Sequence, residues 1–180
     1  MRELFQVWPS SLNDSDVGRI IALAERQPAQ DATVFSSAET MQGIRSCTVR
    51  WLDDEWLRDL LWSYVTQANE RGFNVAVNGH AEMQVTEYTA TQDAHYDWHH
   101  DVQWNGQSEM DRKLSITVQL SDASAYAGGD FEFDEIKTNA DFRSKGTVLV
   151  FPSYLRHKIH PVTAGTRRAL VAWFFGPRWA

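Results

Sequence analysis

Histidine and aspartate residues gather in one short stretch of this 180-residue chain. Between residues 94 and 101 the sequence holds two His-x-Asp pairs, His95/Asp97 and His99/Asp101. A His and an Asp two positions apart on a β-strand point to the same face, so both side chains can reach one metal ion. One such pair is weak by itself, because a lone buried histidine is usually a hydrogen-bonded core residue. The pattern predicts a metal site only if a further ligand comes from another part of the chain.

That further ligand is available from a later predicted strand, which contains His157 and His160. The two histidines lie three positions apart, so only one of them faces the ion. His157 follows the apolar run 148–151 and shares its face with Ile159, whereas His160 shares its face with charged residues, which favours His157. Two histidines and one carboxylate on one face of an octahedron leave open positions, which suits non-haem Fe(II). Strand parity does not decide between the two His-x-Asp pairs, because all four residues share one face.

An anion-binding side chain follows the predicted third ligand. Arg167 opens the apolar segment 167–173 and alternates with Ala169 and Val171, small residues that leave room inside a barrel. A guanidinium forms paired hydrogen bonds with a carboxylate and keeps its charge when it is partly buried. An arginine beside an iron site is what a dicarboxylate cosubstrate requires.

The elements that must position these side chains are mostly strands. From residue 73 onward, short segments rich in β-branched and aromatic residues alternate with turn residues. Strands are predicted at 73–77, 82–89, 113–120, 130–135, 146–151, 155–160 and 167–175, with turns at Asn78-Gly79, Gly128-Gly129, Lys145-Gly146 and Ala164-Gly165. Short strands at this spacing are typical of a sandwich or barrel, whose mouth accommodates a small ligand.

The N-terminal part is predicted to be mainly helical. Capping residues at 13–16 precede apolar positions at helical spacing, and Pro28 ends that run. A second helix begins after Asp53 or Asp54 and ends near Gly72. A polar loop at about 27–40 and a strand at 44–52 connect the two helices.

We therefore expect one α+β domain covering residues 1–180. In this domain the helical region 1–75 supports a β-rich core at about 80–177.

Composition restricts the classes of function. No apolar run approaches the roughly 20 residues that a membrane span needs, and the first residues lack the apolar core of a signal peptide. The single cysteine, Cys47, cannot form an intrachain disulfide, so nothing requires an oxidising compartment. We expect a cytoplasmic protein that does not associate with membranes. The net charge of −7 argues against nonspecific nucleic-acid binding, which needs clustered cations.

The order of the motifs resembles the prolyl 4-hydroxylase branch of the 2-oxoglutarate- and Fe(II)-dependent oxygenases, over roughly residues 84–177. In chain order the matching residues are Tyr88, His99-His100-Asp101, Arg112-Lys113-Leu114-Ser115-Ile116-Thr117, Gly128-Gly129-Asp130-Phe131, Phe151-Pro152-Ser153 before His157, and Pro161-Val162-Thr163-Ala164-Gly165-Thr166-Arg167. The closing block from Gly146 to Gly176 is the most specific. The departures from the family pattern are the additional His-x-Asp, His160 near the distal ligand, and Asp130 where glutamate is common.

The resemblance implies a double-stranded β-helix (jelly-roll, cupin-like) core and decides between the two pairs. In the family an aromatic residue lies about two positions before the ligand histidine, which the segment Tyr96-Asp97-Trp98-His99 supplies here. The resemblance therefore implies the ligands His99, Asp101 and His157. The resemblance also implies that Arg167 binds the distal carboxylate of 2-oxoglutarate and that Tyr88 is a hydrogen-bonding partner nearby. The expected catalytic set is therefore the three ligands with Arg167. The implied cofactors are Fe(II), 2-oxoglutarate and O2, and ascorbate is expected to be stimulatory.

A prolyl residue of a peptide or protein is the substrate that the resemblance implies, hydroxylated with release of succinate and CO2. The segment Gln103–Glu109 is predicted to be a loop that could close over it. Trp98, Trp104 and Tyr126 could form a platform for a proline ring, although ordinary packing also explains each of them.

Several alternatives stay open at this point. They are a hydroxylase of a free amino acid or other small molecule, a zinc enzyme, and a non-catalytic, metal-binding, cupin-like module. Arg167 argues against the last, because a simple binding module needs no dicarboxylate anchor. The sequence does not indicate the oligomeric state.

Overall fold

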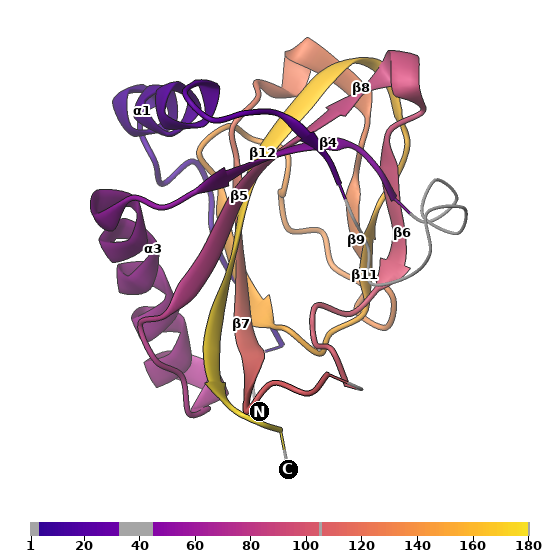
Figure 1. Cartoon of the computed structure of the whole chain (residues 1–180). Coiled ribbons are helices and arrows are strands. Elements are labelled where there is room, and N and C mark those ends of the chain that lie inside the picture. Colours follow the sequence, from indigo (N-terminus) through magenta and orange to yellow (C-terminus); the bar gives the residue numbers. More distant parts are fainter. Residues whose placement is uncertain (1–3, 33–44, 105, 180) are drawn as a thin grey trace.

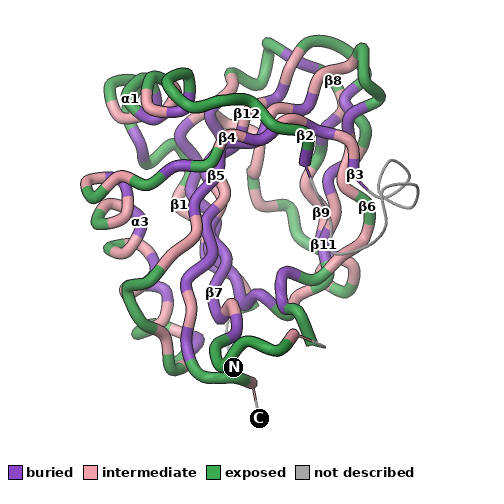
Figure 2. The backbone as a smooth tube through the Cα atoms, viewed as in Figure 1, coloured by how far each residue is buried: buried purple, intermediate pink, exposed green. Residues whose placement is uncertain are grey.

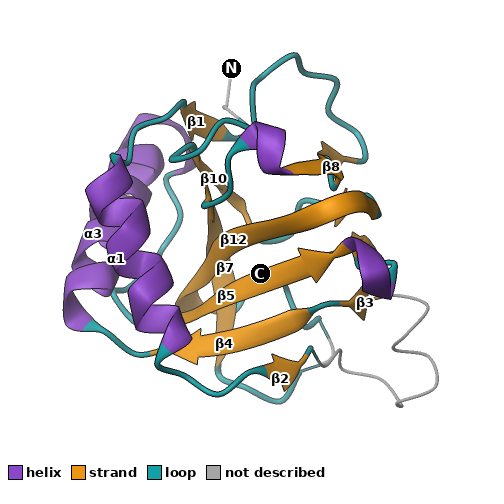
Figure 3. Cartoon of the chain, turned by 90° about the horizontal axis from the view of Figure 1, so that it is seen from above, coloured by secondary structure: helices purple, strands orange, loops and turns teal. Residues whose placement is uncertain are grey.

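The computed structural model describes residues 4–32, 45–104 and 106–179, which fold into two facing antiparallel β-sheets with two helices on the larger sheet (Figure 1). This arrangement is the expected α+β class with a double-stranded β-helix core. The helices α1 (Asp14–Glu25) and α3 (Glu55–Ala68) cover the face of the larger sheet that is turned away from the smaller one (Figures 1 and 3). No helix among the residues described is long and apolar enough to cross a lipid bilayer.

The larger sheet has eight strands, and each pair of neighbours is antiparallel. Its order is β1 (Gln6–Trp8), β10 (Val148–Pro152), β7 (Met110–Gln119), β12 (Val162–Pro177), β5 (Ala81–Thr89), β4 (Thr48–Leu52) and β2 (Gln30–Asp31), with β8 (Tyr126–Gly128) paired to β12. The smaller sheet has the order β3 (Arg45–Ser46), β6 (His95–His99), β11 (His157–Ile159) and β9 (Phe131–Phe133). Short 3₁₀ helices lie at Ala90–Gln92 and Ala123–Ala125.

Both helices begin at the capping residues that the sequence predicts. Asn13 accepts a hydrogen bond from the backbone N–H of Asp16, and Asp54 accepts one from the N–H of Leu57, each 2.9 Å long. Each side chain thereby satisfies one of the N–H groups that a helix start leaves unpaired. The buried positions of both helices recur at helical spacing and face the sheet; they are Val17, Ile20 and Ala24 in α1, and Leu57, Leu61, Val65 and Ala68 in α3.

The main hydrophobic core fills the space between the helices and the larger sheet. Along β12, Leu170, Ala172 and Phe174 point into this core and are fully buried. Because side chains alternate along a strand, Arg167 and Trp173 point to the opposite face, toward the smaller sheet. Figure 2 shows that buried positions follow the strands of the larger sheet, whereas the outer sides of the helices are exposed. The larger sheet therefore has one face for stability and one face for the site.

The strand predicted at 73–77 is wrong. A π-helical turn (Asn69–Phe73) extends α3, and Phe73 is buried against the core. The side-chain amide of Asn69 bonds both the N–H and the C=O of Val75, at 2.9 Å each. Val75 therefore has no backbone group left for a strand ladder.

The turn predicted at Ala164-Gly165 is also wrong, because β12 runs through it. At Gly165, whose φ is 70°, β12 stops pairing with β8, and from Thr166 it pairs with β5. Glycine adopts this positive φ without steric cost, so the strand changes partner without ending.

Two further differences concern the N-terminal part. It contains β1, which was not predicted, and within the loop predicted at 27–40 residues 30–31 form β2. The strand predicted at 44–52 corresponds to β3 and β4. Residues 33–40 of that loop lie outside the described residues.

Candidate metal centre and adjoining pockets

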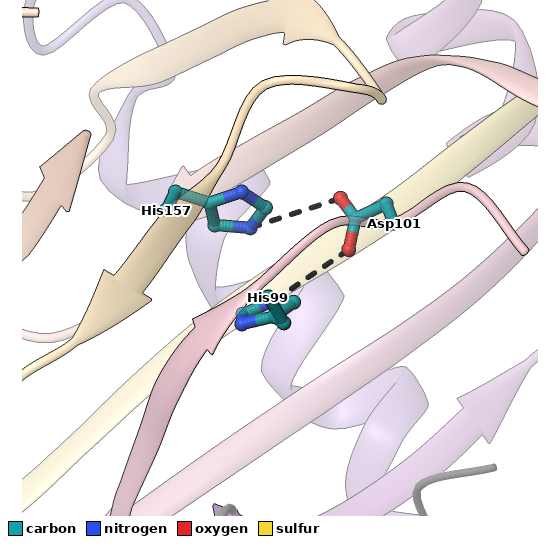
Figure 4. Close-up of side chains that lie close together, drawn as sticks. All are labelled: His99, Asp101 and His157. Atoms are coloured by element: carbon teal, nitrogen blue, oxygen red, sulfur yellow. Dashed lines mark ion pairs between the residues drawn. The ribbon is translucent and has the colours of Figure 1, made fainter. Parts of the chain in front are cut away.

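Three side chains that can ligate a metal converge between the two sheets (Figure 4). His99 and His157 lie on neighbouring strands of the smaller sheet, and Asp101 follows two residues after His99. The Nε2 atom of His99 is 3.6 Å from Oδ1 of Asp101, and Nε2 of His157 is 3.8 Å from Oδ2. The ligand atoms of all three lie within 4.8 Å of one another. Donors at about 2.1 Å from one ion lie roughly 3 to 4 Å apart, so these spacings suit a shared ion.

Both imidazoles are oriented so that Nε2 is available to a metal. Nδ1 of His99 lies 2.7 Å from the carbonyl oxygen of Asp97, and Nδ1 of His157 lies 2.9 Å from that of Leu155. A carbonyl oxygen only accepts hydrogen bonds, so each Nδ1 carries a proton, and in a neutral imidazole with that tautomer Nε2 is the atom that holds the lone pair. The backbone therefore fixes both the ring orientation and the tautomer that a metal ligand requires.

The electrostatics of the cluster also suit a cation. Burial, reinforced by the neighbouring His157, lowers the pKa of His99 to about 3, so this imidazole is neutral at physiological pH. Burial alone would raise the pKa of Asp101, but His157, His99 and the Ser115 hydroxyl outweigh it, and the net shift is downward. A neutral imidazole and an ionised carboxylate are the forms that bind divalent metals. The residues present thus fit Fe(II).

Two serines that the sequence pattern did not single out hold Asp101 in place. The Ser115 hydroxyl, on β7, donates a hydrogen bond of 2.6 Å to Oδ2 of Asp101, and it lies 2.9 Å from the hydroxyl of Ser153. The backbone N–H of Asp101 donates to the carbonyl of Ser153 at 3.0 Å. Both serines are completely buried. The carboxylate is therefore anchored to the larger sheet, although the two histidines belong to the smaller one.

A β-bulge in β6 sets which residues face the pocket. β11 pairs His157 with His99 but Ile159 with Tyr96, so β6 has one extra residue between the two pairings. As a result Tyr96 and His99 lie on the same side although they are three positions apart, and their rings stack with centroids 3.4 Å apart. The assumption of a regular strand, on which the parity argument rested, does not hold here.

The competing histidines and acids lie outside this cluster. Asp97 is exposed, and its carboxylate accepts a hydrogen bond from the N–H of Trp98. Nδ1 of His95 lies 2.7 Å from the carbonyl of Asp93. His160 contacts the carboxylate of Glu132. The structure brings together His99, Asp101 and His157, the set that the sequence analysis selected.

Arg167 and Tyr88 line the same narrow pocket as the three ligands. They are register partners on the adjacent strands β12 and β5, and the guanidinium carbon lies 5.6 Å from the centre of the tyrosine ring. Arg167 is 4% exposed, and no carboxylate of the described residues lies within ion-pair distance of it. A buried guanidinium without a counter-ion is costly, so this pocket is suited to an anionic ligand.

A second cavity of about 400 Å³ adjoins this pocket, and we call it the outer cavity. The two spaces share the residues Arg45, Gln84, Tyr96, Asp101 and Trp173. Gln103, Gly106 and Ser108, from the segment predicted as a loop beside the site, also line the outer cavity. Asn105 lies outside the described residues. The candidate ligand Asp101 therefore lies where a narrow inner pocket meets a wider outer one.

The three aromatic residues proposed as a substrate platform are not brought together at this site. Trp98 lies beneath the ammonium group of Lys158, 4.5 Å from its ring centre, because it neighbours His99 on the strand and points to the other side. Trp104 is 51% exposed. Tyr126 is buried and accepts a hydrogen bond from Gln119. None of the three lines the inner pocket or the outer cavity.

The aromatic residues that do line the outer cavity were not identified from the sequence; among them are Trp51, Tyr96, Trp173 and Phe175. Alternation along β12 could have indicated Trp173 and Phe175, since they follow Arg167 at even spacing. Ser115 and Ser153 fall within the quoted family motifs, but their contact with Asp101, like the position of Arg45, depends on strands that are distant in the sequence.

The chain is similar in sequence to known proteins. The sequence model of the 2OG-Fe(II) oxygenase superfamily matches residues 83–175, which is just over half of the chain. A PKHD-type hydroxylase of Synechococcus sp. (strain CC9311) is 37% identical over 79 residues, covering 43% of this chain and 35% of that protein. The matched region thus spans about a third of the length of the curated relatives.

Solved structures share the fold across nearly the whole chain. A Pseudomonas putida prolyl-4-hydroxylase superposes with a TM-score of 0.73 at 19% identity, covering 97% of this chain and 93% of that one. A prolyl hydroxylase from Trichoplax adhaerens, in complex with a hypoxia inducible factor peptide fragment, gives a TM-score of 0.71 at 18% identity, covering 96% and 84%. At this identity the likeness concerns the fold alone.

Proposed function

The chain belongs to the 2OG-Fe(II) oxygenase superfamily, and from that premise we propose that it is an Fe(II)- and 2-oxoglutarate-dependent dioxygenase. In the proposed reaction a substrate C–H bond is hydroxylated, and 2-oxoglutarate leaves as succinate and CO2. The observation that carries the proposal is one pocket that contains both a His-Asp-His cluster and a buried guanidinium that pairs with no carboxylate in the described part of the chain. A protein that merely stores a metal has no use for the second of these features.

His99, Asp101 and His157 would hold Fe(II), and Ser115 would keep the carboxylate oriented. When bound, Fe(II) supplies the redox chemistry that couples oxidative decarboxylation of 2-oxoglutarate to insertion of one oxygen atom into the substrate. The protein itself orients the ligands and excludes water. Phe131 and Phe151 pack against the ring of His157, with centroids 5.3 and 4.8 Å away, and keep water from that side of the ligand.

Arg167 would bind the distal carboxylate of 2-oxoglutarate, and Tyr88 would donate a hydrogen bond to it. Burial raises the pKa of Tyr88 well above its usual range, so the phenol stays protonated and can donate. The guanidinium can supply two parallel N–H donors to a carboxylate.

The substrate of this reaction would be a prolyl residue of a peptide or protein. Two observations support this choice: the hydroxylase names of the curated relatives, and the fold shared with prolyl hydroxylases, one of which is solved with a peptide. The aromatic lining of the outer cavity gives an apolar surface for a pyrrolidine ring.

The experiment that tests the proposal is measurement of succinate formed from 2-oxoglutarate under air, with added Fe(II) and ascorbate. Reactions are run with and without a panel of proline-containing peptides. Peptide-stimulated succinate together with a product heavier by one oxygen atom would support both the reaction and the substrate. Succinate without stimulation would support the oxygenase and remove the tested peptides. If iron is bound and no succinate forms, the chain is a metal-binding module instead.

A further inference from the structure

A second buried guanidinium stands at the junction of the two cavities. Arg45, on the short strand β3, lines both the inner pocket and the outer cavity and is 9% exposed. Its guanidinium lies 4.5 Å from the centre of the Tyr96 ring, and Tyr96 stacks directly on the metal ligand His99. Arg45 therefore lies one ring away from the metal centre, although it comes from outside the region that matches the family model.

Arg45 has no acidic partner among the residues that the structure describes. Its Nε donates to Sγ of Cys47 at 3.2 Å, a weak interaction that does not balance a positive charge. Two other carboxylates that line the outer cavity have cationic neighbours. Glu82 accepts a 2.6 Å hydrogen bond from Arg112. Asp111 accepts one of 2.8 Å from the backbone N–H of Trp179 and interacts electrostatically with Lys113.

The indole of Trp173 is a second buried donor that lacks a partner in the described part of the chain. Trp173 lines both cavities, is 5% exposed, and its buried Nε1–H has no hydrogen-bond acceptor among the described residues. A buried donor without an acceptor costs about 1 to 3 kcal/mol, so such groups in native proteins usually meet a ligand or water. Two buried donors, one of them charged, therefore border the place where the two cavities meet.

The charges around the two cavities leave room for a second anion besides 2-oxoglutarate. Fe(II), Arg45, Arg167 and the Asp101 carboxylate together carry a net charge of about +3, since both histidine ligands bind as neutral imidazoles. A bound 2-oxoglutarate dianion reduces this to about +1. One further carboxylate would neutralise the site.

We propose that Arg45, with the Trp173 indole N–H, binds a carboxylate of the primary substrate. This rests on the proposed function and narrows its substrate class. The residue that is hydroxylated carries its own free α-carboxylate, as a free amino acid or a C-terminal residue does. An internal prolyl residue, whose α-carbonyl is an amide, lacks that group.

The test compares acids with their neutral amides in wild-type protein. The probes are L-proline against L-prolinamide, glycyl-L-proline against glycyl-L-prolinamide, and an N-acetylated, C-amidated peptide with an internal proline. One readout is stimulation of succinate formation. The second is binding without turnover, followed by tryptophan fluorescence under anaerobic conditions with Fe(II) and 2-oxoglutarate present. We expect each acid to exceed its amide by at least about tenfold, as loss of a charge-assisted hydrogen bond predicts.

Variants then assign this preference to Arg45. Arg45→Met keeps an unbranched apolar stem and removes the guanidinium with its charge, and it should reduce the acid-to-amide ratio to about one. Arg45→Lys should restore part of it. Arg50→Met is the matched control, because Arg50 lies on β4, the next strand along the chain, pairs with Glu87 and lines neither cavity. A ratio within one protein does not change if a variant is merely less stable.

Three outcomes overturn the proposal. The first is that acids show no advantage over amides in either readout. The second is that the blocked internal-proline peptide is preferred and Arg45→Met leaves it unaffected. The third is that Arg45→Met changes only the 2-oxoglutarate requirement, which would assign the guanidinium to the cosubstrate. Succinate that forms from 2-oxoglutarate when no probe is added tests the proposed oxygenase activity by itself, independently of the role of Arg45.

Discussion

His157 lies directly opposite His99 across the antiparallel β6–β11 ladder, and their rings are 4.2 Å apart between centroids. Segments distant in the sequence thus bring two candidate metal ligands together through one backbone register. Because a shift of one residue would turn either histidine to the other face, the register of this small sheet and the metal site depend on each other.

Removal of the central carboxylate is the most direct test of the ligand set. Asp101→Ala should abolish succinate formation and the retention of Fe(II) after gel filtration, because only the two histidines remain. Metal content by mass spectrometry and succinate assays provide the measurements. Asp97→Ala is the matched control and should retain both properties. Loss of iron in Asp97→Ala but not in Asp101→Ala would assign the site to the other pair.

Ser115 should matter for the metal although it does not touch it. Ser115→Ala removes the 2.6 Å hydrogen bond to Asp101 and should weaken Fe(II) binding about 10- to 100-fold, as is typical for partners of a metal ligand. Anaerobic metal titration measures this affinity. Ser63→Ala, on the exposed side of α3, serves as a control that should leave it unchanged. An unaltered affinity in Ser115→Ala would mean that Ser153 and the backbone orient the carboxylate adequately.

Arg167 should determine the requirement for 2-oxoglutarate rather than for metal. Arg167→Ala should raise the KM for 2-oxoglutarate roughly 10- to 100-fold, the effect expected when a charge-assisted hydrogen bond is lost. Iron binding should persist. Arg168→Ala is a suitable control, because Arg168 pairs with Glu87 at the neighbouring position and lines neither cavity. An unchanged KM in Arg167→Ala would remove this residue as the cosubstrate anchor.

The single cysteine should be chemically inert in the folded protein. Burial raises the pKa of the Cys47 thiol, and the lowering effect of the nearby Arg45 does not compensate. A raised pKa keeps the group as the unreactive thiol at pH values where an exposed cysteine is partly thiolate. Mass spectrometry after iodoacetamide treatment at pH 8 should find little labelling in native protein and complete labelling in denaturant. Rapid native labelling would contradict the burial of Cys47 between β3 and β4.

The sequence predicted the features that depend on local chemistry. The caps Asn13 and Asp54 mark the helix starts, because a cap satisfies backbone groups only three residues away. Arg167 was located from its alternation with small residues along one strand. Features that depend on contacts between strands were not predicted. Ser115 on β7 contacts Asp101 after β6, and the bulge between Tyr96 and His99 is defined by how β6 pairs with β11. The predicted strand at 73–77 failed because the side chain of Asn69 occupies the backbone of Val75.

The candidate site is divided between two sheets, with the two histidines on the smaller sheet and Arg167 on the larger one. Under the proposed function, the distance between the sheets would set how long a bridging diacid must be. Packed sheets lie roughly 10 Å apart, a separation that core packing holds within narrow limits. Under the proposed function, a diacid shortened by one carbon would leave one end without its partner. Selection for the length of the cosubstrate would then be a property of the scaffold as much as of any single side chain.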